Sequence, residues 1–136
     1  MKNSWKPIKY KEPKKEVQPH IISEYDKYII KFLTPAIKNR QLIRFWYEDT
    51  NRSDFEDFRI IEPHTIGQLN TKTANIVLTG WFLPTSEQIV YGHSEKWVNY
   101  ILEGISKIEI LEQRFPHPRY GYKNPDSRLS FTFCTT

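Results

Sequence analysis

The sequence predicts a single, mainly β domain in which five short strands form a bent sheet that closes into a small barrel, with an N-terminal helix and an irregular C-terminal segment. Three observations support this fold class. The length of 136 residues suits one domain. Strand-length runs of β-branched and aliphatic residues recur between residues 42 and 111. Short antiparallel strands hide their edges by closing into a barrel.

The first predicted element is a helix at residues 24–33. Ser23 followed by Asp26 resembles a helix-starting cap, and apolar residues then recur every three or four positions. A second short helical turn would begin at Pro35, because proline in the first helical position sacrifices no intrahelical donor, and would end near Arg40. We expect these helical residues to plug one open end of the barrel.

The first predicted strand is residues 42–47, whose side chains alternate, with Ile43 and Phe45 pointing inward. The segment that follows, 48–57, is rich in carboxylates. It lacks the central glycine and the terminal glutamate of a calcium-binding EF-hand loop. We therefore expect a solvated hairpin loop there.

The central stretch, residues 59–83, predicts two paired strands joined by a long connection. Ile61 belongs to the first apolar strand, and residues 76–78 belong to the second. Pro63 and Gly67 lie between them and are residue types typical of turns. The first strand is therefore predicted to end near Pro63, where a turn and a polar loop begin.

The last two predicted strands are residues 97–102 and 106–111, separated by a bulge or bend at Gly104. Before them, residues 84–95 predict a loop that contains a short edge strand. After them, from residue 115 onward, three prolines and scattered tyrosines predict an irregular segment lying against the barrel.

The net charge of +4 is concentrated at the two ends of the chain. Residues 1–20 carry six lysines against two glutamates, residues 114–136 carry a net +3, and the middle of the chain carries a net −3. The first twenty residues are also proline-containing and too polar to fold alone. The chain therefore divides into a basic arm, 1–20, and one domain, 21–136, whose C-terminal clasp begins near residue 114.

Several classes of protein are excluded by composition. No apolar run of about 18 residues and no apolar signal segment occur, so the sequence predicts a cytoplasmic protein without membrane contact. The single cysteine, Cys134, excludes an internal disulfide and a cysteine-cluster zinc site. The four histidines show no metal-ligand spacing, and no nucleophile elbow or phosphate-binding glycine loop is present. We expect no enzyme activity, metal or cofactor.

The chain resembles the stand-alone WYL domain, a small barrel of the SH3/Sm type found mostly in bacterial and phage regulators. The residues that carry the resemblance are Arg59, Glu62-Pro63-His64, Gly67, the segment 78–83 and the segment 104–108. Residues 42–47 resemble the first strand of the family, and residues 115–122 resemble the tail common in its stand-alone members. The resemblance implies an SH3/Sm-like fold and a binding or regulatory role.

One segment departs from the family pattern. Regulatory WYL domains place arginines in a strand that corresponds to residues 98–105, and these arginines are held to bind an anionic ligand or nucleic acid. Here Val98, Ile101 and Gly104 stand at those positions. The resemblance therefore places no anion pocket in this strand. Regulators also carry a helix-turn-helix before the barrel, which the lysine-rich residues 1–20 cannot form.

Six residues are candidate contacts to a ligand or to nucleic acid: Arg44, Tyr47, His64, Trp81, Arg119 and Tyr120. The imidazole of His64 can donate or accept a hydrogen bond near neutral pH. A turn histidine bonded to its own loop is an equal alternative. Trp81 could stack on unpaired bases together with Trp46 and Trp97, although core or oligomer contact is the commoner role of strand tryptophans.

Arg119 and Tyr120 lie in a segment where basic and aromatic residues mix as they do in nucleic-acid-binding proteins, but the same segment could simply clasp the barrel through its tyrosines. Arg44 and Tyr47 offer a guanidinium and a phenol on opposite faces of the first strand. For Tyr47 core packing is the commoner role, and for Arg44 that of an ordinary surface cation.

The sequence thus predicts a non-enzymatic, WYL-like binding module, of the kind used in transcription regulation, that senses a small anionic ligand or nucleic acid. The alternative is a protein–protein interaction or self-assembly module with no affinity for nucleic acid, in which exposed strand edges and tryptophans bind a protein partner or a second copy of the chain.

Overall fold

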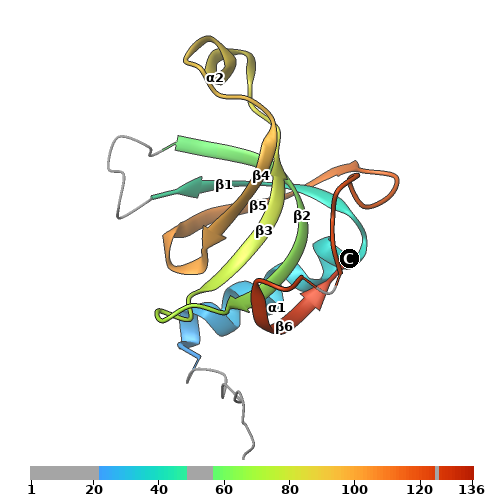
Figure 1. The fold of residues 1–136 in the computed structure, drawn as a ribbon. Coiled ribbons are helices and arrows are strands. Elements are labelled where there is room, and N and C mark those ends of the chain that lie inside the picture. Colours follow the sequence, from blue (N-terminus) through green and yellow to red (C-terminus); the bar gives the residue numbers. More distant parts are fainter. Residues whose placement is uncertain (1–21, 49–56, 125) are drawn as a thin grey trace, which may run out of the picture.

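The fold is mainly β, as predicted. The computed structural model describes residues 22–48, 57–124 and 126–136. Six strands form one antiparallel sheet, and helix α1 (Glu24–Lys38) precedes them. Figure 1 shows a strongly curved sheet with α1 lying across one of its ends. The predicted arm, 1–20, and most of the predicted acidic loop lie outside the described residues.

The sheet has the order β4-β3-β2-β1-β5, and β6 also pairs with β2. The strands are β1 (Gln41–Tyr47), β2 (Asp57–Leu69), β3 (Ile76–Phe82), β4 (Lys96–Ile101), β5 (Ile105–Arg114) and β6 (Leu129–Thr135). A short 3-10 turn, η1 (Leu102–Gly104), joins β4 to β5. Within the described residues β4 and β5 do not pair, so the sheet is not closed and the predicted barrel is not confirmed.

Helix α1 is one continuous helix, so the prediction of a second helical turn starting at Pro35 is wrong. The predicted cap is confirmed, because the Asp26 N–H donates to Ser23 Oγ at 3.0 Å. Pro35 lies inside the helix. The helix continues past it because Leu33 and Ile37, on either side, are fully buried against the sheet.

Strand β2 is 13 residues long and includes Pro63 and Gly67. The prediction that the strand ends in a turn near Pro63 is therefore wrong. The first half of β2 pairs with β1 and its second half with β6, while β3 pairs along the other edge. Pro63 pairs with Gly80 and Thr65 with Thr79, so His64 is one extra residue in the β2–β3 pairing. Such a bulge tolerates a neighbouring proline and bends the strand.

The C-terminal segment is irregular only as far as residue 128, because β6 follows it. The prediction of five strands is therefore short by one. Gly67 allows β6 to approach: a Cβ there would lie 2.6 Å from Leu129 Cδ1 and 2.7 Å from the Phe131 carbonyl oxygen. Gly67 thus serves close strand contact and not a turn.

The predicted edge strand after residue 84 is instead the short helix α2 (Ser86–Val90). Thr85 and Gln88 cap it reciprocally, with Gln88 N–H donating to Thr85 Oγ1 and Thr85 N–H donating to Gln88 Oε1. The Gln88 amide also donates to the Phe58 carbonyl at 2.8 Å, which ties α2 to β2. Figure 1 shows α2 projecting beyond the sheet.

The hydrophobic core lies between the curved sheet and α1. Its largest fully buried side chains include Phe45, Phe82, Tyr100 and Leu33. The prediction that Ile43 and Phe45 point inward is confirmed. None of the described helices has both the length and the apolar character that crossing a bilayer requires.

Candidate ligand-binding site

The candidate site is built where the C-terminal clasp, here residues 115–124, passes over β2, β3 and β4. The clasp begins at Phe115, whose N–H donates to the Arg40 carbonyl at 2.9 Å. The Phe115 ring stacks on His64 with a centroid distance of 5.1 Å. The predicted contact between this segment and the sheet is therefore present.

His64 is the residue on which the clasp closes. The ring is completely buried, and the bulge explains its placement: Ile61 and Ile66 are both in the core although they are five residues apart, so the strand changes face between them. The Arg119 N–H donates to His64 Nε2 at 2.9 Å. Since Nε2 accepts, Nδ1 carries the proton and donates to the Glu62 carbonyl at 2.9 Å.

The surroundings of the His64 ring favour its neutral form. The rings of Trp97 and Tyr122 lie 4.8 and 4.9 Å from it, centroid to centroid. This burial lowers the pKa of His64 below its usual value, although the Glu62 carbonyl acts in the opposite direction. Because both ring nitrogens are occupied, His64 holds the clasp, and a ligand reaches it only if the clasp moves.

Glu62 and Arg119 form a second attachment of the clasp. Arg119 Nε lies 3.1 Å from Glu62 Oε1, and Arg119 Nη2 lies 2.6 Å from Oε2. The carboxylate is buried, whereas the guanidinium is about one-third exposed. This bidentate pair raises the pKa of Arg119. The guanidinium carbon lies 5.0 Å from the Trp81 ring centroid, a cation–π distance.

The structure brings three of the six predicted site residues together. His64, Trp81 and Arg119 are linked by the contacts above, and Tyr120, next in the chain, is almost fully exposed. Tyr47 lies apart from them in the core, where its hydroxyl accepts from the Ile101 N–H at 3.1 Å. Core packing, the commoner role, is therefore confirmed for Tyr47.

Arg44 also lies apart from the clasp. Its guanidinium carbon is 3.8 Å from the Phe58 ring centroid, and Nη1 is 3.6 Å from Glu109 Oε1. It lines a different pocket, of about 530 Å³, between β1, β2 and the α2 region. One small ligand would therefore not contact both Arg44 and Arg119.

The three tryptophans do not form one stacking platform. Trp81 and Trp97 are opposite each other on β3 and β4, with ring centroids 5.5 Å apart and edge to face. Trp46 lies elsewhere on the sheet, against Phe58. All three are half-buried, so each packs part of its ring against the protein and leaves the rest accessible.

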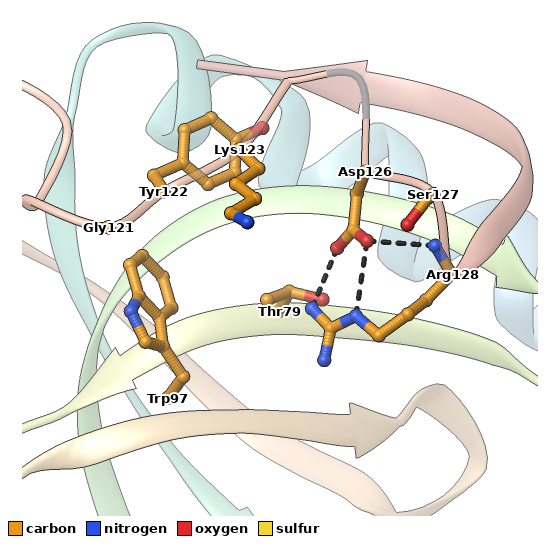
Figure 2. Close-up of a pocket in the computed structure, with 8 residues that line it drawn as sticks. All are labelled: Thr79, Trp97, Gly121, Tyr122, Lys123, Asp126, Ser127 and Arg128. Atoms are coloured by element: carbon orange, nitrogen blue, oxygen red, sulfur yellow. Dashed lines mark hydrogen bonds and ion pairs between the residues drawn. The ribbon is translucent and has the colours of Figure 1, made fainter.

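A pocket of about 310 Å³ opens between the clasp and the sheet, lined by Thr79, Trp97, Gly121, Tyr122, Lys123, Asp126, Ser127 and Arg128. Figure 2 shows the Trp97 and Tyr122 rings on one side of it and the Asp126–Arg128 pair on the other. The two ring centroids are 6.0 Å apart and tilted by 32°. The pocket thus combines aromatic surface with three charged side chains.

The charge balance of this pocket favours an anion. Arg128 Nε and Nη2 donate to the two Asp126 oxygens at 3.1 and 2.7 Å, and this pairing lowers the pKa of Asp126. Lys123 makes no hydrogen bond or ion pair with any other residue in the described ranges. Two cations therefore face one carboxylate, which leaves a net charge of about +1.

Of the residues in this pocket, the sequence indicates Trp97 as a possible stacking residue, and Tyr122 and Arg128 as members of the segment in which basic and aromatic residues mix. It does not single out Lys123. The mixture of basic and aromatic residues after Arg119 was the available signal. Among the described residues, no three or more His, Cys, Asp or Glu side chains gather where they could hold a metal ion. No protein-family model matches the chain, and no curated protein matches it.

Proposed function

We propose that the protein is a non-enzymatic binding module, similar to stand-alone WYL domains, that takes a small anionic ligand or nucleic acid in the pocket between clasp and sheet. The observation that carries the proposal is the meeting of two aromatic rings, Trp97 and Tyr122, with Lys123 and Arg128 around one pocket. We place the module in the cytoplasm, in a regulatory role.

The pocket suits a flat ring joined to a phosphate. Aromatic side chains offer stacking surface to any base, and lysine and arginine donate charge-assisted hydrogen bonds to phosphate oxygens. The volume of about 310 Å³ lies at the lower end of the range for ligand pockets. We expect a pocket of this size to take one nucleotide, free or within a single strand.

The family resemblance gains support from the contacts of the clasp. Two of the stretches that resemble WYL domains are Glu62-Pro63-His64 and residues 115–122. They meet in space through Arg119, which contacts both Glu62 and His64. A cationic site on the clasp would take the place of the family arginines that are lacking in residues 98–105.

We also propose that the curved sheet is an SH3/Sm-like barrel. The strand order supports this, because β1 to β4 follow one another as neighbours and β5 returns to pair with β1. The three-residue turn η1 keeps the end of β4 close to the start of β5. A sheet with this connectivity has its two edges next to each other.

The test is a fluorescence anisotropy titration of a short labelled single-stranded oligonucleotide, with unlabelled mononucleotide as competitor, at low and high salt. We expect Lys123→Gln to weaken binding roughly tenfold, because a hydrogen bond to a charged group contributes about 1.5–3 kcal/mol. The matched control is Lys31→Gln, which removes the same charge from the exposed side of α1.

The competitor and the salt series separate the remaining cases. Displacement by mononucleotide identifies a small-ligand site, and its absence identifies a site for a strand. Binding that is equal in wild type and Lys123→Gln and disappears at high salt assigns the attraction to the basic arm. That outcome, or no binding at all, contradicts the proposed site.

A second candidate function is protein–protein interaction or self-assembly. One observation favours it: Ile89, Val90 and Tyr91, on and beside α2, are 57, 81 and 77 % exposed. Consecutive exposed apolar side chains on a projecting element are typical of interaction surfaces. The mass of the protein in solution distinguishes this candidate from the first.

A further inference from the structure

A third pocket, lined mainly by polar residues, lies where the start of α1 meets the β2–β3 loop and η1. Its volume is about 250 Å³. The oxygen-bearing side chains that line it are Ser23, Asp26, Thr73, Asn75 and Glu103. It shares no lining residue with the pocket beneath the clasp.

Asp26 is the unusual member of this pocket. The residue is only 9 % exposed, and its Oδ1 has no hydrogen-bond partner among the described residues. A buried carboxylate oxygen without a partner is costly, because its charge has lost the solvation of water. The pocket therefore holds one carboxylate oxygen, Asp26 Oδ1, to which no described residue donates a hydrogen bond.

Glu103 adds a second carboxylate to the same pocket from η1. Burial raises the pKa of Asp26, and the charge of Glu103 raises it further, while the hydrogen bond with Ser23 lowers it. The partial positive charge at the start of α1 favours an ionised Asp26, but it does not offset burial and repulsion. A bound cation would relieve both.

The ligand set identifies the class of cation. All the side chains that could coordinate are oxygen donors: two carboxylates, two hydroxyls and one amide. Hard oxygen ligands suit Ca²⁺ or Mg²⁺, whereas zinc and copper prefer imidazole or sulfur. With two carboxylates and neutral oxygens, the remaining positions would be filled by water, and Ca²⁺ accepts such irregular coordination more readily than Mg²⁺.

We propose that the Asp26–Glu103 pocket is a binding site for a divalent cation with oxygen ligands, Ca²⁺ above all. The cation would link α1 to η1, the turn between β4 and β5. The Tyr25 hydroxyl donates to the carbonyl of Ile105, the residue that follows η1, so α1 is already joined to the start of β5 there. Binding would therefore strengthen the attachment of α1 to the sheet.

Terbium luminescence provides a direct readout, because Tb³⁺ occupies calcium sites and is excited by a nearby tyrosine, here Tyr25. The full-length protein is titrated with Tb³⁺, and Ca²⁺, Mg²⁺ and spermidine are then added as competitors. We expect an emission increase that Ca²⁺ reverses. Asp26→Asn keeps the shape of the side chain and removes its charge, and we expect it to bind Tb³⁺ at least tenfold more weakly.

The matched control is Glu24→Gln, which removes an exposed carboxylate from the same helical turn, where it pairs with Lys27. It should bind Tb³⁺ as the wild type does. In thermal unfolding, Ca²⁺ should raise the melting temperature of the wild type and of Glu24→Gln, and not that of Asp26→Asn. Potassium chloride at equal ionic strength should give no such difference.

Three outcomes overturn the proposal: no emission increase in the wild type, equal emission in Asp26→Asn, or displacement by spermidine and not by Ca²⁺, which indicates a site for an amine. Asp26→Asn is first checked by circular dichroism. If it does not fold, Glu103→Gln, at the exposed side of the pocket, carries the same comparison with Glu24→Gln.

Discussion

His64 joins two parts of the chain that are 55 residues apart in sequence. Its Nε2 accepts the Arg119 N–H, and its ring is enclosed by Trp97, Phe115 and Tyr122. Protonation of Nε2 would turn this acceptor into a donor that faces another donor. The native structure therefore requires the neutral ring, and the attachment of the clasp depends on pH.

We expect the free energy of unfolding to fall as the pH is lowered through the range in which His64 titrates. The unfolded chain takes up the proton near the ordinary pKa of 6.5, whereas the folded chain resists it because its pKa is lower. The unfolded state therefore binds more protons, and stability rises with pH. The contribution of His64 to stability is constant above pH 6.5 and decreases below it, until the pH falls past the pKa of His64 in the folded state.

Urea unfolding between about pH 8 and pH 5.5 measures this dependence. His64→Gln should remove most of the slope, because glutamine does not titrate. His117→Gln serves as the control, since His117 is exposed and outside the ring cluster. If the slope survives in His64→Gln and disappears in His117→Gln, the pH dependence comes from His117 and the prediction is contradicted.

Among the elements, β2 carries the most contacts, because β1, β3 and β6 all pair with it. Gly67 pairs with β6, and a Cβ there would meet Leu129 and the Phe131 main chain. We expect Gly67→Ala to lower the free energy of unfolding by about 1–3 kcal/mol, the usual cost of overpacking. The Phe131 carbonyl, 2.7 Å from the new Cβ, is main chain and cannot rotate away.

Leu129→Ala separates the two clashes at this position, because Leu129 Cδ1 is the other close atom. In the Leu129→Ala background, adding Gly67→Ala should cost less than in the wild type but still destabilise, since the Phe131 carbonyl remains. Urea unfolding of the four proteins gives the comparison. An alanine at residue 67 that stabilises the protein would mean that β6 does not pair as described.

The sequence predicted those helices and strands whose signals lie in neighbouring residues. The cap at Ser23 marks the start of α1, and the alternation around Ile43 and Phe45 marks β1. Pro63 and Gly67 carry the signal of a turn, yet β2 passes through both, because a bulge accommodates the proline and β6 requires the glycine. That information lies in strand partners that are distant in sequence.

In the candidate site, too, single residues could be predicted from their neighbours in the sequence, but their contacts could not. Arg119 stood out because it lies among aromatic residues, and His64 because it follows a proline. Their contact with each other could not be predicted, since it depends on the clasp crossing β2. Lys123 lies in the same mixture of basic and aromatic residues, but nothing in the sequence separates it from the other cations there, and only its position in the pocket with Trp97 does so.

The whole molecule offers two routes to self-assembly, one electrostatic and one apolar. Residues 1–20 carry a net +4 and residues 21–113 a net −3, so the arm of one copy would be attracted to the acidic middle of another. The apolar route is the exposed surface formed by Ile89, Val90 and Tyr91. Salt weakens the first and leaves the second unchanged.

We expect the protein to have the mass of one chain, 16.3 kDa, at physiological and at higher salt. A stable interface buries about 800 Å² on each partner, whereas three side chains such as those at the α2 tip expose on the order of 400 Å² on each copy. The tip alone is therefore too small, and the attraction of the arm is screened at physiological salt.

Light scattering after size-exclusion chromatography measures the mass, with Val90→Lys as the test variant and Lys31→Gln as an unrelated surface control. A doubled mass at low salt alone would assign assembly to the basic arm. A doubled mass at both salt concentrations that returns to 16.3 kDa in Val90→Lys would establish the α2 tip as an interface. Because a larger contact than the tip would then be needed, the neighbouring pocket beside Arg44 would be the surface to examine next.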